Sequence, residues 1–145
     1  MTTTEKHLQR IKEHLEEIND AIDEGMEKKP ITIGFHCSAC SIDLLELYLH
    51  STHKIPLGMQ VRHNWFKKPK EGQKIIPLAE RKIGAEFDEK ERIYDLMYTI
   101  EGNRETLLYG NATFERVREV YTVFQKLKEI LEKKLAQEGI HLEKN

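Results

Sequence analysis

One stretch of the chain limits its possible folds more than any other, because it is apolar on almost every side. Residues 38–53 read SACSIDLLELYLHSTH and carry little basic charge. On a helix, the stretch places apolar side chains around most of the surface: Ala39, Ile42, Leu44, Leu45, Leu47, Tyr48 and Leu49. A helix of this kind has to be covered by neighbours on several sides. We therefore expect it to be the central helix of a bundle.

The other helices are predicted from apolar residues that recur at spacings of three and four. The first covers residues 2–28, and the central helix covers 32–53. The third covers 78–109, where Gly84 indicates a break near the start and Gly102 indicates close packing or a kink. The fourth follows a cap at Asn111 or Thr113 and ends at Gly139.

Together these segments predict an all-α fold. The expected architecture is an antiparallel up-down-up-down four-helix bundle, formed by one domain of residues 1–145. The connection between helices 2 and 3, residues 54–78, holds three of the four prolines and has no sustained periodicity. We expect it to be a long mobile loop, and we expect residues 139–145 to form a frayed tail.

Composition bears on the location of the protein. Charged residues make up 33% of the chain, and the formal net charge is −2. The N-terminal MTTTEKHLQR lacks the apolar core of a signal peptide, and no apolar run approaches the roughly 20 residues that cross a bilayer. We expect a cytoplasmic protein without a membrane segment, whose two cysteines stay reduced.

The predicted loop belongs to the most basic part of the chain. From residue 54 to 82, eight Lys and Arg residues accompany two acidic residues, a net charge of +6. Arg62, Trp65, Lys67 and Lys68 combine phosphate-binding and base-stacking side chains, which is typical of proteins that bind single-stranded nucleic acid. The alternative is a solvated loop whose aromatic side chains cover the bundle.

Arg104 takes the next helical position after the apolar series Ile93, Met97 and Ile100. A guanidinium on an apolar stripe needs a partner, because an unpaired buried charge is unfavourable. One interpretation is an ion pair with a carboxylate from another helix or from a second copy of the chain. The other is a ligand-facing arginine that holds a phosphate through its planar fork.

His36, Cys37 and Cys40 form a further group on the central helix. Imidazole and thiolate groups at this spacing share a helix face and can bind Zn²⁺. A structural zinc site takes four ligands, and only three lie together here. We therefore favour a packing role and expect no cofactor, with a metal-bound structural bundle as the alternative.

Two longer stretches carry a family resemblance. The segment SACSIDLLELYLHSTHKIP resembles the second helix of HEPN domains (higher eukaryote and prokaryote nucleotide-binding). The segment IYDLMYTIEGNRETLLYGN resembles their third and fourth helices around a characteristic arginine. The resemblance implies a four-helix bundle that commonly dimerises. Many members are metal-independent endoribonucleases or toxins paired with nucleotidyltransferases, and others bind or scaffold without catalysis.

In the active members a histidine follows that arginine by a few positions. Here the matching arginine is Arg104, and Tyr109 stands where the histidine is expected. A phenol is a poor general base at neutral pH. The resemblance, with this departure, predicts a homodimeric binding module for RNA, a nucleotide or a protein partner such as a nucleotidyltransferase, without efficient catalysis.

Each predicted ligand-binding residue has a role in this hypothesis. Phosphate contacts are assigned to Arg62, Lys67, Lys68 and Arg104, base stacking to Trp65, and a hydrogen bond to Tyr109. The alternative is the endoribonuclease toxin of a toxin-antitoxin pair, with a degenerate centre made of Arg104 and Tyr109.

Overall fold

The computed structural model describes residues 3–68, 72 and 74–142, and this part of the chain contains helices and no strand. The α-helices are α1 (Thr4–Glu24), α2 (Pro30–Ser51), α3 (Leu78–Ile83), α4 (Lys90–Tyr109) and α5 (Phe114–Gln137). Two short 3₁₀ helices, η1 (Met26–Lys28) and η2 (His63–Phe66), lie in the connections. The all-α prediction is confirmed for the described residues.

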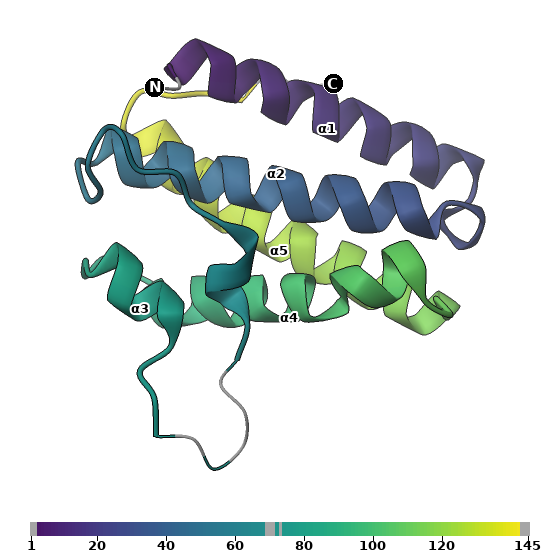
Figure 1. The fold of residues 1–145 in the computed structure, drawn as a ribbon. Helices are drawn as coiled ribbons and strands as arrows, with labels where there is room; N and C mark the ends of the chain where they lie inside the picture. The colour runs from purple at the N-terminus through teal and green to yellow at the C-terminus, as the bar shows by residue number, and fades with distance from the viewer. Residues whose placement is uncertain (1–2, 69–71, 73, 143–145) are drawn as a thin grey trace.

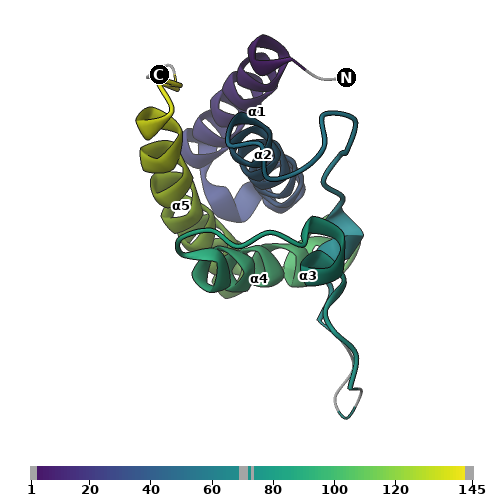
Figure 2. The same cartoon turned by 90° about the vertical axis from the view of Figure 1, so that its left-hand side faces the viewer.

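The apolar stretch forms most of α2, which lies among the other long helices. α2 packs against α1, α4 and α5 (Figures 1 and 2). Every residue from 41 to 49 is buried. α2 and α4 touch at Gly34, where an added Cβ atom would lie 2.7 Å from the Cβ atom of Leu107. A larger residue at this position would push the two helices apart.

α1 begins after Thr3, whose hydroxyl accepts a hydrogen bond from the backbone N–H of Lys6. The helix ends earlier than predicted, because Gly25 has a φ of 114° and turns the chain toward α2. The short η1 helix completes this turn, so that α2 returns along α1 (Figure 1). Residue 2, the predicted start, lies outside the described residues.

The predicted third helix is two helices. Gly84 adopts a left-handed conformation, with φ 59°, and ends α3. The chain resumes a helix at Lys90, whose ammonium group donates hydrogen bonds to Glu80 at 2.9 Å and Glu86 at 2.6 Å. These bonds hold the end of α3 against the start of α4. The break foreseen at Gly84 therefore separates two elements.

The first half of the predicted loop packs onto the helices. Ile55, Val61, Trp65 and Phe66 are buried. Phe66 contacts two rings of α4 in edge-on geometry, with centroid distances of 5.7 Å to Tyr94 and 5.9 Å to Tyr98. The aromatic residues of η2 thus fix this part of the connection against α4. Residues 69–71 and 73 of the predicted loop lie outside the described residues.

The predicted tail is also tied down over its described part. The N–H of Ile140 donates to the carbonyl of Leu135 at 2.9 Å, and the N–H of Gly139 donates to Ala136 at 3.0 Å. These two bonds form a Schellman motif, with Gly139 at a φ of 77°. Ile140 and Leu142 pack against the core, and residues 143–145 lie outside the described residues.

Candidate functional site

A cleft of about 510 Å³ lies between η2, the residues that follow it, and α4. Its lining contains basic, aromatic and acidic side chains: His63, Asn64, Phe66, Lys67, Lys68, Tyr98, Glu101, Gly102, Arg104 and Glu105. The packing of Phe66 against α4 places the loop residues on one wall and the helix residues on the other. Three predicted phosphate-binding residues, Lys67, Lys68 and Arg104, therefore line the same cleft.

Arg104 has no hydrogen-bond or ion-pair partner among the described residues. Its Nε atom is buried and unbonded in this part of the chain. The carboxylate partner that one interpretation of the sequence required is not supplied by a neighbouring helix within these ranges. Because a buried guanidinium nitrogen without an acceptor is unfavourable, an anionic ligand in the cleft would satisfy it.

Tyr98 contributes a second polar atom of this kind. Its hydroxyl oxygen is buried and has no partner in the described part of the chain. Burial raises the pKa of Tyr98, with smaller contributions from the negative charges of Glu80 and Asp95. The hydroxyl therefore keeps its hydrogen and is available as a donor. Lys68 lies over the same ring, with its Nζ atom 5.8 Å from the ring centroid.

Three side chains from separate elements meet beside the cleft. Oε1 of Glu101 on α4 accepts a hydrogen bond from the hydroxyl of Ser38 on α2 at 2.7 Å. The same oxygen lies 3.0 Å from Nδ1 of His63, whose ring is also 3.0 Å from the Ser38 hydroxyl. The side chain of Glu101 is 3% exposed and that of His63 is 41% exposed. The buried carboxylate thus orients an accessible imidazole at the cleft wall.

The remaining predicted ligand-binding residues do not line this cleft. Trp65 is 5% exposed and belongs to the core, so its ring is not free to stack on a base. Arg62 is exposed and precedes η2. Tyr109 ends α4 with 84% of its surface exposed. The structure therefore brings Lys67, Lys68 and Arg104 together and leaves the other three apart.

A second concentration of polar groups lies between α1 and α2. We call it the polar seam, and it consists of His7, Arg10 and His14 of α1 with His36, Asp43, Glu46 and His50 of α2. Nε2 of His7 lies 2.6 Å from Oε2 of Glu46. Arg10 donates two hydrogen bonds to Oδ1 of Asp43, and Nδ1 of His14 lies 2.8 Å from Nδ1 of His36.

The three residues of the zinc alternative have separate environments. Cys37 and Cys40 are fully buried in the core, and burial raises the pKa of both thiols. Zinc binds the thiolate form, which this environment disfavours. His36 turns to His14 on α1. This geometry supports the packing role of the two cysteines.

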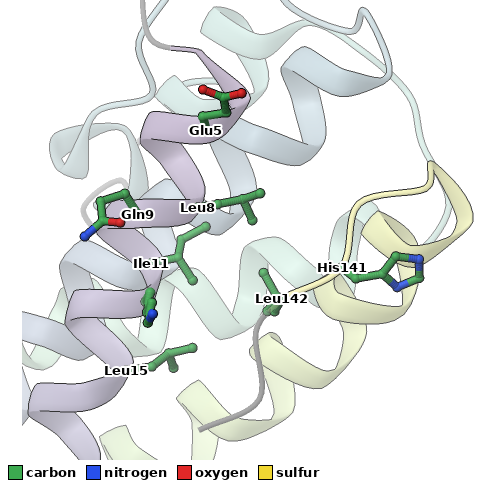
Figure 3. Close-up of a pocket in the computed structure, with 8 residues that line it drawn as sticks. Glu5, Leu8, Gln9, Ile11, Leu15, His141 and Leu142 are labelled. Carbon is green, nitrogen blue, oxygen red and sulfur yellow. The ribbon is translucent and has the colours of Figure 1, made fainter.

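A further hollow, of about 250 Å³, lies between α1 and the C-terminal residues. Leu8, Ile11 and Leu15 face it from α1, and Leu142 faces it from the other side (Figure 3). Its walls combine leucine and isoleucine side chains with scattered polar ones and no convergent set of charges. It gives no indication of a chemical role.

Sequence reasoning missed the roles of His63, Glu101 and the polar seam. A signal for the seam was present, since Asp43 and Glu46 are the two acidic residues of α2, the central helix. Acidic residues on a helix buried on all sides need buried partners. For Glu101 and His63 no such signal existed, because their meeting depends on how η2 docks on α4.

None of the helices in the described ranges combines the length and apolarity that crossing a membrane requires. Compared with protein-family models, with curated proteins and with solved structures, the chain matches none of them.

Proposed function

We propose that the protein is a HEPN-like up-down-up-down helical module that binds the phosphate groups of RNA or of a nucleotide in the cleft between η2 and α4. The observation that carries this proposal is Arg104, which lines the cleft and has a buried Nε atom without a partner among the described residues. The hydroxyl of Tyr98 and the ammonium groups of Lys67 and Lys68 lie along the same cleft.

The charges of the cleft favour an anion. Lys67, Lys68 and Arg104 are basic side chains, whereas of the two cleft carboxylates Glu101 is already engaged by Ser38 and His63 and Glu105 is exposed. A guanidinium matches the geometry of a phosphate and can donate two parallel hydrogen bonds to it. The aromatic ring of Tyr98 supplies apolar wall beside these donors. Binding is therefore directed at the phosphate, with the base or sugar against this ring.

Anisotropy of a labelled single-stranded RNA tests the proposal. AMP and inorganic phosphate serve as competitors, which distinguish binding of RNA from binding of a free nucleotide. Arg104→Gln should weaken binding about tenfold or more, because hydrogen bonds to charged groups contribute about 1.5–3 kcal/mol. The double variant Lys67→Ala/Lys68→Ala should also weaken it. The matched control removes two exposed lysines from α5, Lys126→Ala/Lys133→Ala. Equal losses in both double variants would reject the cleft.

The second candidate function is RNA cleavage at the same cleft. It is favoured by His63, because a buried carboxylate that fixes one imidazole nitrogen leaves the other oriented for proton transfer. The expected result is that the parent protein cleaves RNA and that neither His63→Ala nor Arg104→Ala does. If the protein binds RNA but the RNA stays intact after long incubation, cleavage is rejected and only the binding function stands.

We also propose that the module acts as a homodimer. Large apolar side chains are exposed where α2 begins and where α4 is followed by α5: Ile31, Phe35, Tyr109 and Phe114. These element ends lie at the same end of the molecule (Figure 1). A second copy would remove this surface from water. Sedimentation equilibrium should give a dimer that Phe35→Asp weakens, whereas a monomer at all concentrations would reject it.

A further inference from the structure

The polar seam contains a buried set of metal-ligand side chains that the cleft does not use. His7, Asp43 and Glu46 are 1%, 8% and 5% exposed, and one ligand-type atom of each can be chosen so that all three lie within 4.8 Å of one another. We propose that these residues bind one divalent transition-metal ion, of the class of Zn²⁺ or Mn²⁺, through His7 Nε2 and the two carboxylates. The inference does not depend on the proposed function of the cleft.

The orientation of His7 is the first argument. Its Nδ1 atom lies 3.0 Å from the carbonyl oxygen of Thr3, which can only accept a hydrogen bond. Nδ1 therefore carries a hydrogen, and Nε2 points toward Oε2 of Glu46 at 2.6 Å. Both ring nitrogens face oxygen acceptors. A histidine that donates one N–H to a backbone carbonyl and turns its other nitrogen to carboxylates has the arrangement that proteins use for metal ligands.

The two carboxylates are held in the same manner. Oε1 of Glu46 accepts the backbone N–H of Val61 at 2.7 Å, which leaves Oε2 for the seam. Oδ1 of Asp43 accepts both hydrogen bonds from Arg10, and Oδ2 lies 3.6 Å from Nε2 of His14. Each candidate ligand is thus fixed by a group outside the set. Such support keeps ligands in place before an ion arrives.

His50 supplies a second, independent observation. Its Nε2 atom lies 2.8 Å from the carbonyl oxygen of Met59, so the hydrogen is on Nε2. Its Nδ1 atom then carries a lone pair, is buried, and has no partner within the described ranges. The ring stands beside His7, with 6.0 Å between the centroids. The ring that neighbours His7 therefore carries a buried nitrogen of ligand type without a partner, outside the set of three.

Distance and ligand chemistry narrow the kind of ion. Two ligands at about 2.1 Å from a tetrahedral ion stand about 3.4 Å apart. Nε2 of His7 and Oε2 of Glu46, now 2.6 Å apart, would therefore separate slightly, and a pair as far apart as 4.8 Å would move inward. One imidazole and two carboxylates suit Zn²⁺, Mn²⁺ or Fe²⁺, whereas Mg²⁺ and Ca²⁺ favour oxygen alone.

An ion has a route to the site. An open hollow of about 280 Å³ is lined by Asp43 and Glu46, together with Arg10, Gln60, Val61 and His63. The side chain of Arg10 is 43% exposed, so it can turn into solvent when a cation approaches Asp43. The carboxylates consequently face a surface opening while His7 closes the inner side.

The competing explanation is an ion pair between protonated His7 and Glu46, and metal titration separates the two. The whole chain, treated with a chelator and dialysed, is titrated with ZnCl₂ and separately with MnCl₂ by calorimetry. We expect one tightly bound equivalent of metal. Glu46→Gln and Asp43→Asn should each abolish it, because an amide oxygen is a much weaker ligand than a carboxylate. Circular dichroism shows whether each variant is folded.

Two control variants test whether His36 or His141 contributes to metal binding. His36→Ala removes the pair with His14, and His141→Ala removes an exposed imidazole, so both should keep the bound equivalent. In the unmodified protein, Mn²⁺ should broaden the NMR signals of the His7 ring and the Val61 amide first, which tests the site even if a variant unfolds. Absence of stoichiometric binding, binding that survives Glu46→Gln, or broadening centred elsewhere would overturn the proposal.

Discussion

The imidazole of His63 and the carboxylate of Glu101 connect the docked loop to α4, with 3.0 Å between Nδ1 and Oε1. The same oxygen accepts the hydroxyl hydrogen of Ser38, so α2 joins the contact. One buried carboxylate thereby links the central helix, the loop and the helix that carries Arg104. The shape of the cleft depends on this junction.

Glu101→Ala is expected to destabilise the fold. It leaves the buried hydroxyl of Ser38 without its carboxylate acceptor and releases His63, a change worth about 1–3 kcal/mol for a buried group that loses its partner. Glu105→Ala removes an exposed acid of the same helix and should stay within about 0.5 kcal/mol of the parent. Urea unfolding measures both, and equal free energies of unfolding would contradict the role of Glu101.

Gly102→Ala should raise stability while lowering ligand affinity. A Cβ atom at Gly102 meets nothing within 4 Å, so close packing, one of the two alternatives expected from sequence, does not require glycine here. Alanine in a helix interior is favoured over glycine by about 0.5–1 kcal/mol. Because Gly102 lines the cleft, the added methyl group narrows it.

Gly34→Ala provides the opposite case, since its Cβ atom would overlap with Leu107. It should destabilise by about 1–3 kcal/mol, as overpacked cores do. Thermal unfolding and RNA anisotropy of the two variants separate packing from binding. A destabilised Gly102→Ala protein would show that the cleft wall is not open as described.

Stability should fall between pH 7.5 and 5.5, in part through His36. Burial lowers the pKa of His36, the neighbouring His14 lowers it further, and Glu17 acts in the opposite direction. A lowered pKa means that the unfolded chain binds the proton more readily than the folded one. The contribution of His36 to the free energy of unfolding is therefore complete above the pKa of the unfolded chain, about 6.5, and is lost as the pH falls below that value.

The variant His36→Ala should lose less stability over this range than the parent protein. The contact of 2.8 Å between Nδ1 of His14 and Nδ1 of His36 explains the effect, because two protonated rings would turn hydrogens toward each other. Urea midpoints at the two pH values give the comparison. An identical loss in both proteins would assign the dependence to other groups.

The two cysteines should resist thiol reagents in the folded protein. Cys37 and Cys40 have no exposed surface, and burial raises the pKa of both thiols. Because the thiolate is the reactive form, Ellman's reagent should label both residues in urea and neither, on the time scale of minutes, in buffer. Rapid labelling of the native protein would show that α2 is not enclosed as described.

Periodicity was sufficient to predict the long helices, because their apolar residues face a common core at spacings of three and four. It did not show that the predicted loop docks. The sequence allows Trp65 to stack on a base or to cover the bundle, and in the structure it is buried. Local pattern cannot distinguish these outcomes, since both place aromatic residues in a basic segment.

The sequence predicts individual residues of the candidate site, but it does not predict that they lie together in one cleft. Arg104 was identified from its place on an apolar stripe, and Lys67 and Lys68 from their basic surroundings. Their convergence in one cleft depends on the contact of Phe66 with Tyr94 and Tyr98, which joins distant parts of the chain. A tertiary contact of this kind leaves no periodic signal in a single sequence.

The most direct test of the proposed binding site is the side-chain NMR signal of Arg104. Arg104 lines the cleft, and its Nε–H group is buried and has no acceptor among the described residues. Titration with AMP or a short single-stranded RNA should shift that signal at the concentrations that give binding by anisotropy. The variant Arg104→Gln lacks the group and therefore assigns the signal. Saturating ligand that leaves the Arg104 signal unchanged, while other regions shift, would contradict the proposed site.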